Sequence, residues 1–95
     1  MIRHIVFFKL KESSAANKTA VKTKILSLKG KIEGVQHIEM GLNFSKETRA
    51  YDLALIVDFD TLSALQYYAT HPQHLEALGA IKNLVEKTHV VDYEL

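Results

Sequence analysis

The chain has 95 residues with a formal net charge of +1, and 47% of the residues are hydrophobic and 24% charged. This length and composition are typical of one ordered domain spanning residues 1–95, and the absence of cysteine excludes disulfides, thiolate catalysis and cysteine-ligated zinc. No apolar stretch approaches the roughly 20 residues that span a bilayer, and the apolar part of the N-terminus is too short for a signal peptide, so we expect a cytoplasmic protein.

The first third of the chain predicts a strand followed by a helix. Residues 2–10, IRHIVFFKL, are rich in Ile, Val and Phe and favour a strand. Ser13 or Ser14 can then cap a helix of about 16 residues. The apolar residues of this segment recur at helical spacing and form one stripe: Val21, Ile25, Leu28 and Ile32. Gly34 marks the turn that ends it.

Two alternating segments in the middle predict a β-hairpin. Residues 35–44 alternate, and one face carries Ile38, Met40, Leu42 and Phe44. Residues 45–49, SKETR, are polar and predict the connecting loop. Residues 50–59 form the clearest predicted strand, and one face carries Tyr51, Leu53, Leu55, Val57 and Phe59.

The last third predicts a broken helical region and a final strand. Asp60 or Thr61 can cap the first helix. Pro72 disfavours helical geometry at His71, so we expect it to be the first residue of a new helix. We predict that this helix runs to about Lys87 with an apolar stripe of Leu75, Leu78, Ile81 and Val85, before a strand over residues 88–94. The order βαββαβ predicts an α+β, ferredoxin-like fold, a four-stranded antiparallel sheet with helices on one face.

The first strand is apolar on both of its faces. Ile5 and Phe7 point one way, while His4, Val6 and Phe8 point the other. A sheet that is apolar on both sides needs cover on both sides, and two helices cover only one. We therefore expect a symmetric homodimer in which two sheets face each other and enclose a small apolar cavity, with the His4 side lining that cavity.

Charge is distributed unevenly along the chain. Residues 1–31 contain eight Lys or Arg and one acid, a balance of +7, and residues 32–95 contain four Lys or Arg and ten acids, a balance of −6. A basic patch for nucleic acid is one interpretation. Lysines that flank an amphipathic helix are the other, and we favour it because arginine is scarce and no aromatic residues interleave with the lysines. We expect neither nucleic-acid nor membrane binding.

Five segments in this order resemble the stress-responsive A/B barrel (Dabb) domain family: HIVFFKLK, GVQHIEMGLN, RAYDLALIVDF, YYATHPQHLEAL and VVDYE. The resemblance covers nearly the whole chain and implies a ferredoxin-like protomer that pairs into a dimeric α/β barrel. Many bacterial members of this family have no assigned activity. One plant member is a cyclase that closes a polyketide ring by aldol condensation without a cofactor.

Three residues match that cyclase by position. The resemblance places its strand-1 histidine on His4, its catalytic histidine, at the end of an HPxH motif, on His74, and a tyrosine three residues before the motif on Tyr68. A histidine titrates near neutral pH, so His74 can act as a general base with Tyr68 bonded to its ring or to a substrate oxygen. The alternative is that His74 packs as an ordinary helix residue beside Leu75 and Leu78.

We include His71 with His4, Val6 and Phe8 among the candidate ligand-binding residues. The alternative for His71 is a local role at the helix junction, and for His4 a hydrogen-bonded core residue. His71 and His74 are too few for a zinc site, which usually takes three or four protein ligands. We predict no metal and no cofactor.

Three functional hypotheses follow from the sequence. The first is a stress-associated protein, otherwise uncharacterised, that binds a small apolar or carbonyl-containing molecule inside the dimer-enclosed barrel. The second is a cofactor-independent cyclase, isomerase or lyase in which His74 is the base. The third is a structural or regulatory dimer without catalysis. A similar fold also serves cofactor-free monooxygenases, so oxygen chemistry stays open as a further alternative.

Overall fold

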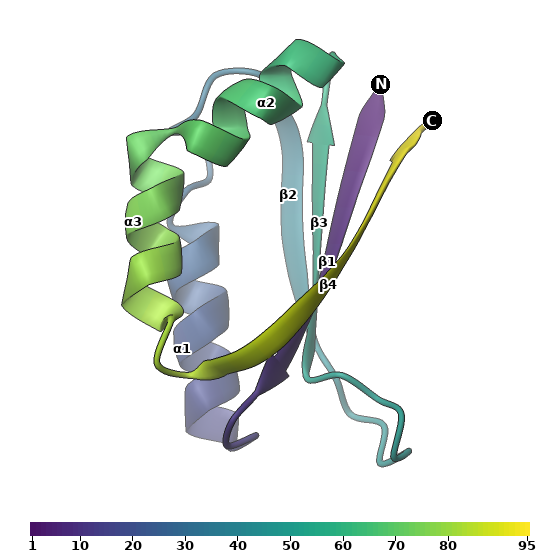
Figure 1. Cartoon of the computed structure of the whole chain (residues 1–95), viewed down its shortest axis with the longest axis vertical. Coiled ribbons are helices and arrows are strands. Elements are labelled where there is room, and N and C mark those ends of the chain that lie inside the picture. The colour runs from purple at the N-terminus through teal and green to yellow at the C-terminus, as the bar shows by residue number, and fades with distance from the viewer.

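The computed structural model describes residues 1–95 as one antiparallel sheet with helices packed on a single face (Figure 1). The elements in chain order are β1 (Ile2–Leu10), α1 (Ala15–Leu26), β2 (Val35–Leu42), β3 (Leu53–Phe59), α2 (Leu62–Thr70), α3 (Pro72–Ile81) and β4 (Val85–Glu94). The four strands lie in the order β2-β3-β1-β4, which confirms the predicted ferredoxin-like topology. None of the helices has the length and apolar character needed to cross a membrane.

Strand β1 lies inside the sheet and presents alternate residues to its two faces. It pairs with β3 on one side and β4 on the other, so that His4 lies opposite both Val57 and Asp92. Phe8 is 3% exposed and points to the helices, whereas its neighbour Phe7 is 40% exposed on the outer face. The predicted two-sided pattern is therefore confirmed, and the helices cover the face that carries His4, Val6 and Phe8.

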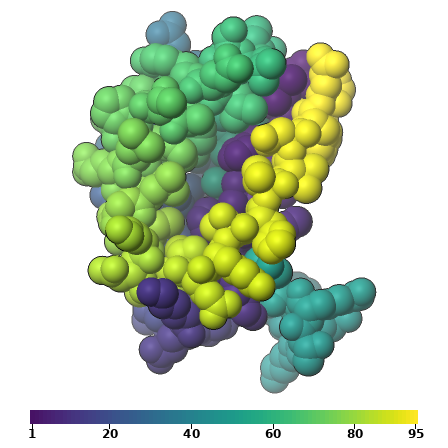
Figure 2. All heavy atoms as spheres, in the orientation of Figure 1, coloured from purple at the N-terminus to yellow at the C-terminus, as the bar shows by residue number.

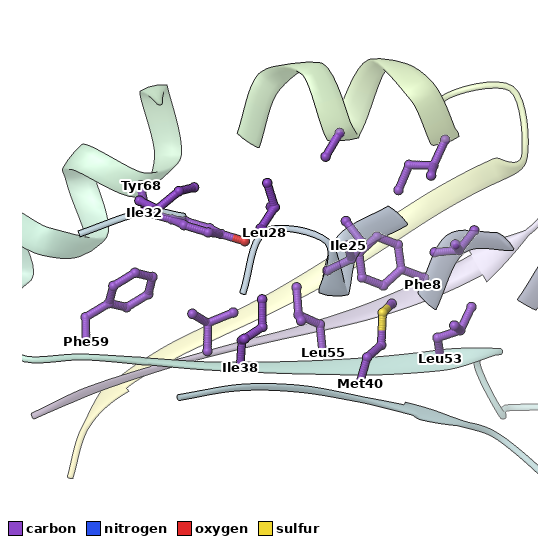
Figure 3. Packing of buried hydrophobic residues seen from close by; sticks show 14 of the residues in the cluster. Phe8, Ile25, Leu28, Ile32, Ile38, Met40, Leu53, Leu55, Phe59 and Tyr68 are labelled. Atoms are coloured by element: carbon purple, nitrogen blue, oxygen red, sulfur yellow. The ribbon is translucent and has the colours of Figure 1, made fainter. Parts of the chain in front are cut away.

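The hydrophobic core lies between this inner face and the three helices (Figure 3). Burial of each large apolar side chain contributes about 1.5–3 kcal/mol to folding. The fully buried members come from three different elements: Val21, Ile25, Leu53, Val57, Phe59 and Tyr68. The core therefore fastens the helix layer to the sheet through contacts that are far apart in sequence.

Helix α1 is shorter than its apolar stripe. Its N-cap is Ser14, whose hydroxyl accepts a hydrogen bond from the Asn17 amide at 3.1 Å. The helix ends at Leu26 rather than after about 16 residues, although Leu28 and Ile32 are still buried in the turns that follow. The turn segment continues the apolar stripe without continuing the helix.

The predicted break at Pro72 is confirmed. Pro72 is the first residue of α3, and the His71 side chain accepts a hydrogen bond from the Gln73 amide at 3.1 Å, which makes His71 the N-cap. The predicted end near Lys87 is wrong, because α3 stops at Ile81 and Val85 already pairs with Leu10 in the sheet.

The predicted stripe of α3 is only partly correct. Leu75 is 53% exposed, and Ala77 and Ile81 are the buried residues of this helix. Pairing of the chain after Ile81 with β1 ends the helix, since the amide of Lys11 donates to the Leu84 carbonyl at 2.9 Å. Sheet pairing thus overrides the helical spacing of Ile81 and Val85.

The connection between β2 and β3 is longer than the predicted five-residue loop, and residues 43–52 lie outside both strands. Asp52 is buried at its end, where it accepts hydrogen bonds from the Leu10 amide at 2.7 Å and the Ser13 hydroxyl at 2.8 Å. Burial would raise the pKa of Asp52, but these hydrogen bonds and the nearby lysine charges outweigh it and hold the pKa below its usual value. Asp52 therefore ties this connection to the end of β1 as a carboxylate.

We predict that Gly34→Ala destabilises the protein clearly more than Gly30→Ala. Both glycines have positive φ angles, 93° and 75°, so both substitutions cost about 1–2 kcal/mol in backbone strain. Only at Gly34 would the new methyl lie 2.8 Å from the Ala64 side chain, whereas Gly30 has open space. Overpacking adds about 1–3 kcal/mol. Equal urea midpoints for the two variants would show that α2 moves away from the new methyl at Ala64 without a measurable cost in stability.

Candidate functional site

A cavity of about 250 Å³ lies between the inner face of the sheet and the helices. The residues that line it come from six elements: His4, Val6, Phe8, Ile25, Leu55, Tyr68, His74, Leu78, Thr88 and Val90. Figure 2 shows β1 at the bottom of the cleft that separates the helices α2 and α3 from β4. A second, mostly apolar hollow of about 340 Å³ adjoins the cavity and shares Phe8, Leu78 and Thr88 with it.

Five of the six residues selected from the sequence line this cavity. His4, Val6 and Phe8 reach it from β1, Tyr68 from α2 and His74 from α3. The expectation that the His4 side faces a second copy of the chain is wrong, because that side faces the helices. The cavity therefore lies within one chain and is not enclosed between two sheets.

The sixth residue, His71, does not line the cavity. Its ring nitrogen Nδ1 accepts from the Gln73 amide, and its ring contacts Tyr67 edge-on at a centroid distance of 5.3 Å. Since the cap uses this nitrogen, the structure gives His71 the local role at the helix junction and does not bring it to the cavity.

Tyr68 places a hydroxyl without a partner inside the protein. The residue is 1% exposed, and its hydroxyl has no hydrogen-bond partner in the chain. Figure 3 shows the ring reaching from α2 over the sheet, with the hydroxyl at its inner end. Burial raises the pKa of Tyr68 to about 12, so the hydroxyl keeps its proton at neutral pH. An unpaired buried hydroxyl costs about 1–3 kcal/mol, which a ligand oxygen in the cavity would offset.

The ring of His74 packs against the ring of Tyr68 at a tilt of 38°, with a distance of 4.2 Å between ring centroids. Its Nδ1 lies 3.2 Å from the Ala69 carbonyl oxygen, and because a carbonyl only accepts, Nδ1 carries the proton and Nε2 keeps a free lone pair. Burial lowers the pKa of His74, against the opposing effect of the Ala69 hydrogen bond. The ring is therefore neutral and basic at pH 7. The expected hydrogen bond between Tyr68 and this ring does not form.

Asp92 is a site residue that the sequence analysis did not identify. Its carboxylate pairs with Nδ1 of His4, which therefore donates to it. The His4 ring lies 6.3 Å from the Tyr68 ring between centroids. The signal was the register of β1 with β4, which puts Asp92 directly opposite His4. The register of β4 depends on where α3 ends, and the sequence pattern placed that end near Lys87 instead of at Ile81.

The cavity as a whole combines apolar walls with three polar rings. Tyr68 offers a proton, His74 offers a lone pair, and His4 is oriented by Asp92. No three histidine or carboxylate side chains lie close enough together to hold a metal ion. The arrangement can therefore bind an oxygen-bearing molecule and move a proton at it.

The four-stranded antiparallel sheet with helices on one face places the chain in the class of ferredoxin-like α+β domains. In this chain a cavity lies under the helix layer. The family model described as the stress responsive A/B barrel domain, Dabb, matches residues 2–95, so the chain belongs to the Dabb family. The resemblance noted in the sequence is thereby confirmed. No curated protein matches the chain significantly.

Solved structures of similar proteins have the same fold. A dimeric protein of unknown function from Bacteroides fragilis is 33% identical, with a TM-score of 0.86 over 99% of this chain and 95% of the other. A dimeric protein of unknown function from Thermobifida fusca is 25% identical, with a TM-score of 0.86 over 99% and 90%. A Dabb family protein from Mesorhizobium loti is 27% identical, with a TM-score of 0.83 over 99% and 95%.

We predict that Tyr68→Phe stabilises the ligand-free protein by about 1 kcal/mol, because it removes an unpaired buried hydroxyl and keeps the ring. Chemical denaturation at pH 7 measures this change. The control is Tyr67→Phe on the same helix, where the exposed hydroxyl is solvated and little change is expected. A loss of stability in Tyr68→Phe would mean that the hydroxyl already has a partner in solution.

Proposed function

We propose that the chain binds a small, largely apolar molecule that carries a carbonyl or hydroxyl oxygen. The observation that supports this proposal is the buried Tyr68 hydroxyl without a partner beside an open cavity. Native proteins rarely leave such a group unpaired, so an acceptor oxygen from a ligand accounts for it. The apolar walls formed by Val6, Phe8 and Leu78 select for the rest of the molecule.

The size of the cavity supports a small ligand. Its volume of about 250 Å³ is near the lower end of ligand sites, and the adjoining hollow of about 340 Å³ gives a longer molecule room to extend under α3. A ligand oxygen between Tyr68 and His4 would accept from the hydroxyl, while a ligand hydroxyl could donate to Nε2 of His74. These contacts explain recognition without any charged group on the ligand.

Butyrophenone and butylbenzene test this proposal because they share an aromatic ring and a four-carbon chain and differ in the carbonyl. We expect butyrophenone to bind more tightly and to raise the melting temperature. Tyr68→Phe should weaken butyrophenone binding about tenfold, which corresponds to one lost hydrogen bond, and leave butylbenzene unaffected.

Calorimetric or NMR titration measures both affinities, with Tyr67→Phe as the matched control. Equal affinity of the two compounds for the unaltered protein would refute recognition of an oxygen by Tyr68. If neither compound binds, the binding proposal is refuted and the third hypothesis, a structural or regulatory dimer without catalysis, is favoured.

A second candidate function is cofactor-independent acid–base catalysis at a carbonyl compound. It is favoured by the opposite protonation preferences of two rings that are 4.2 Å apart. His74 Nε2 can remove a proton from the carbon next to a carbonyl, and the Tyr68 hydroxyl can donate to the oxygen on which negative charge develops. The same pair would serve a cyclase, an isomerase or a lyase.

We predict that the protein catalyses exchange of the α-protons of butyrophenone with deuterated water and that His74→Gln abolishes this exchange. Because burial lowers the pKa of His74, the rate should rise with pH through a pKa below 6.5 and be flat between pH 7 and 8. Proton NMR follows the loss of the α-proton signal. The control is His37→Gln, which removes an exposed ring outside the cavity. Exchange no faster than in buffer would refute the catalytic candidate.

We also propose that the chain forms a homodimer through the outer face of its sheet, as the dimeric relatives suggest. One row of this face is apolar across three strands, with Ile5 opposite both Ile56 and Val91. The charged pair at the next outer position, Arg3 and Asp58, makes two hydrogen bonds of 2.8 and 2.9 Å within the chain. Covering the face therefore buries no unpaired charge there.

Ile56→Arg should convert the dimer to a folded monomer, because each subunit would bury a guanidinium beside Ile5, with Glu39 of β2 as the one carboxylate directly across from it. Sedimentation equilibrium at micromolar concentration measures the mass, and circular dichroism checks the fold. The control is Gln66→Arg, at an exposed position on α2. A monomeric unaltered protein, or a dimer that tolerates Ile56→Arg, would contradict this interface.

A further inference from the structure

The connection between β2 and β3, residues 43–52, forms an arm that the functions proposed above do not use. It has ten residues between strand ends, whereas a β-hairpin usually needs two to five. Figures 1 and 2 show that it projects beyond the sheet, on the side away from the helices. Phe44 in this arm is 95% exposed, the largest exposed fraction among the large hydrophobic residues of the chain.

The arm is held in a defined position at its base. The Asn43 amide donates to the Asp52 carbonyl at 2.9 Å, and the Asp52 amide donates to the Phe8 carbonyl at 2.8 Å. The Asn43 side chain also bonds the backbone of Ser45 in both directions. The Tyr51 ring contacts the rings of Phe7 and His89, which belong to the outer face of β1 and β4. The base of the arm, next to Phe44, is therefore held against the sheet.

The inner side of the arm is continuous with the outer face of the sheet. A hollow of about 510 Å³ lies in the angle between them, and its apolar walls include Phe7, Leu42, Tyr51 and Ala54. Phe7 and Ala54 pair across β1 and β3 on the outer face, so one surface runs from the sheet onto the arm. A molecule packed on the outer face would also meet the arm.

The outer face alone is small for a stable interface. The four strands have 9, 8, 7 and 10 residues. With strands about 4.8 Å apart and about 3.3 Å per residue, they cover a projected area of about 540 Å² before side-chain relief is added. A standard interface buries about 800 Å² on each partner. The arm is the adjoining surface that extends the contact area.

We propose that the arm is a clasp of the homodimer: the arm of each copy lies along the flank of the other copy and buries Phe44 against it. This inference rests on the homodimer proposed above. The two-fold symmetry of such a pair makes both arms equivalent, so each dimer buries two Phe44 rings. The partner is a second copy because the arm extends the same face that the apolar row of Ile5, Ile56 and Val91 prepares for it.

Phe44→Trp tests the clasp, because the chain contains no tryptophan and the new indole is then the sole reporter. We expect its fluorescence maximum to shift to shorter wavelength as protein concentration rises, with the same midpoint as the dimer mass in sedimentation. In the combination of Phe44→Trp with Ile56→Arg the indole should stay solvent-exposed at all concentrations. Leu62→Trp, at an exposed position on α2, is the control and should show no shift.

A second variant, Phe44→Ser, should raise the dimer dissociation constant at least about 100-fold, since each dimer loses two buried phenyl rings. The matched variant Leu62→Ser should leave it unchanged. A dimer mass with a solvent-exposed indole and an unaltered dissociation constant in Phe44→Ser would overturn the clasp while the homodimer stands. A monomer at every concentration would overturn both.

Discussion

The structure depends on one constraint: a sheet that is apolar on both faces, in a chain with helices for only one of them. Strand β1 shows it most directly, since Phe8 is buried under the helices while Phe7 stays on the outer face. The helix layer covers the face that carries Phe8 and encloses a core and a cavity. The outer face keeps an apolar row and an ion pair whose two charges satisfy each other, and exposed apolar patches of this kind mark interaction sites.

Within the cavity, one physical effect prepares two rings for opposite roles. Burial disfavours the charged form of every titratable group, so it keeps the Tyr68 hydroxyl protonated and the His74 ring neutral. The helix break at Pro72 brings these two rings into contact, which a continuous helix would have turned to different faces. The same break uses His71 as a cap and so removes it from the cavity. A local backbone feature thereby decides which histidine is available for chemistry.

Two carboxylates position parts of the molecule that are distant in sequence. Asp52 ties the base of the arm to the end of β1 and the start of α1 through the Leu10 amide and the Ser13 hydroxyl. Asp92 orients the ring of His4 from the neighbouring strand. Both residues lie in segments that resemble the Dabb family, but each acts through a backbone position that only the assembled sheet provides. The arm and the cavity thus depend on the pairing of β1 with its neighbours.

The sequence alone determined the order of the elements and the helix break at Pro72, because alternation, capping and proline geometry act over a few residues. Among the predicted residues that line the cavity, Val6 and Phe8 were selected by strand alternation, and His4, Tyr68 and His74 by the resemblance to the family. The tertiary structure decided which face of β1 the helices cover, where α3 ends, and that Asp92 meets His4. His4 and Asp92 are 88 residues apart, and their contact requires the register between two strands. A local pattern cannot specify that register. The residues after Ile81 can either continue the helix or pair with β1, and only the tertiary structure decides between the two.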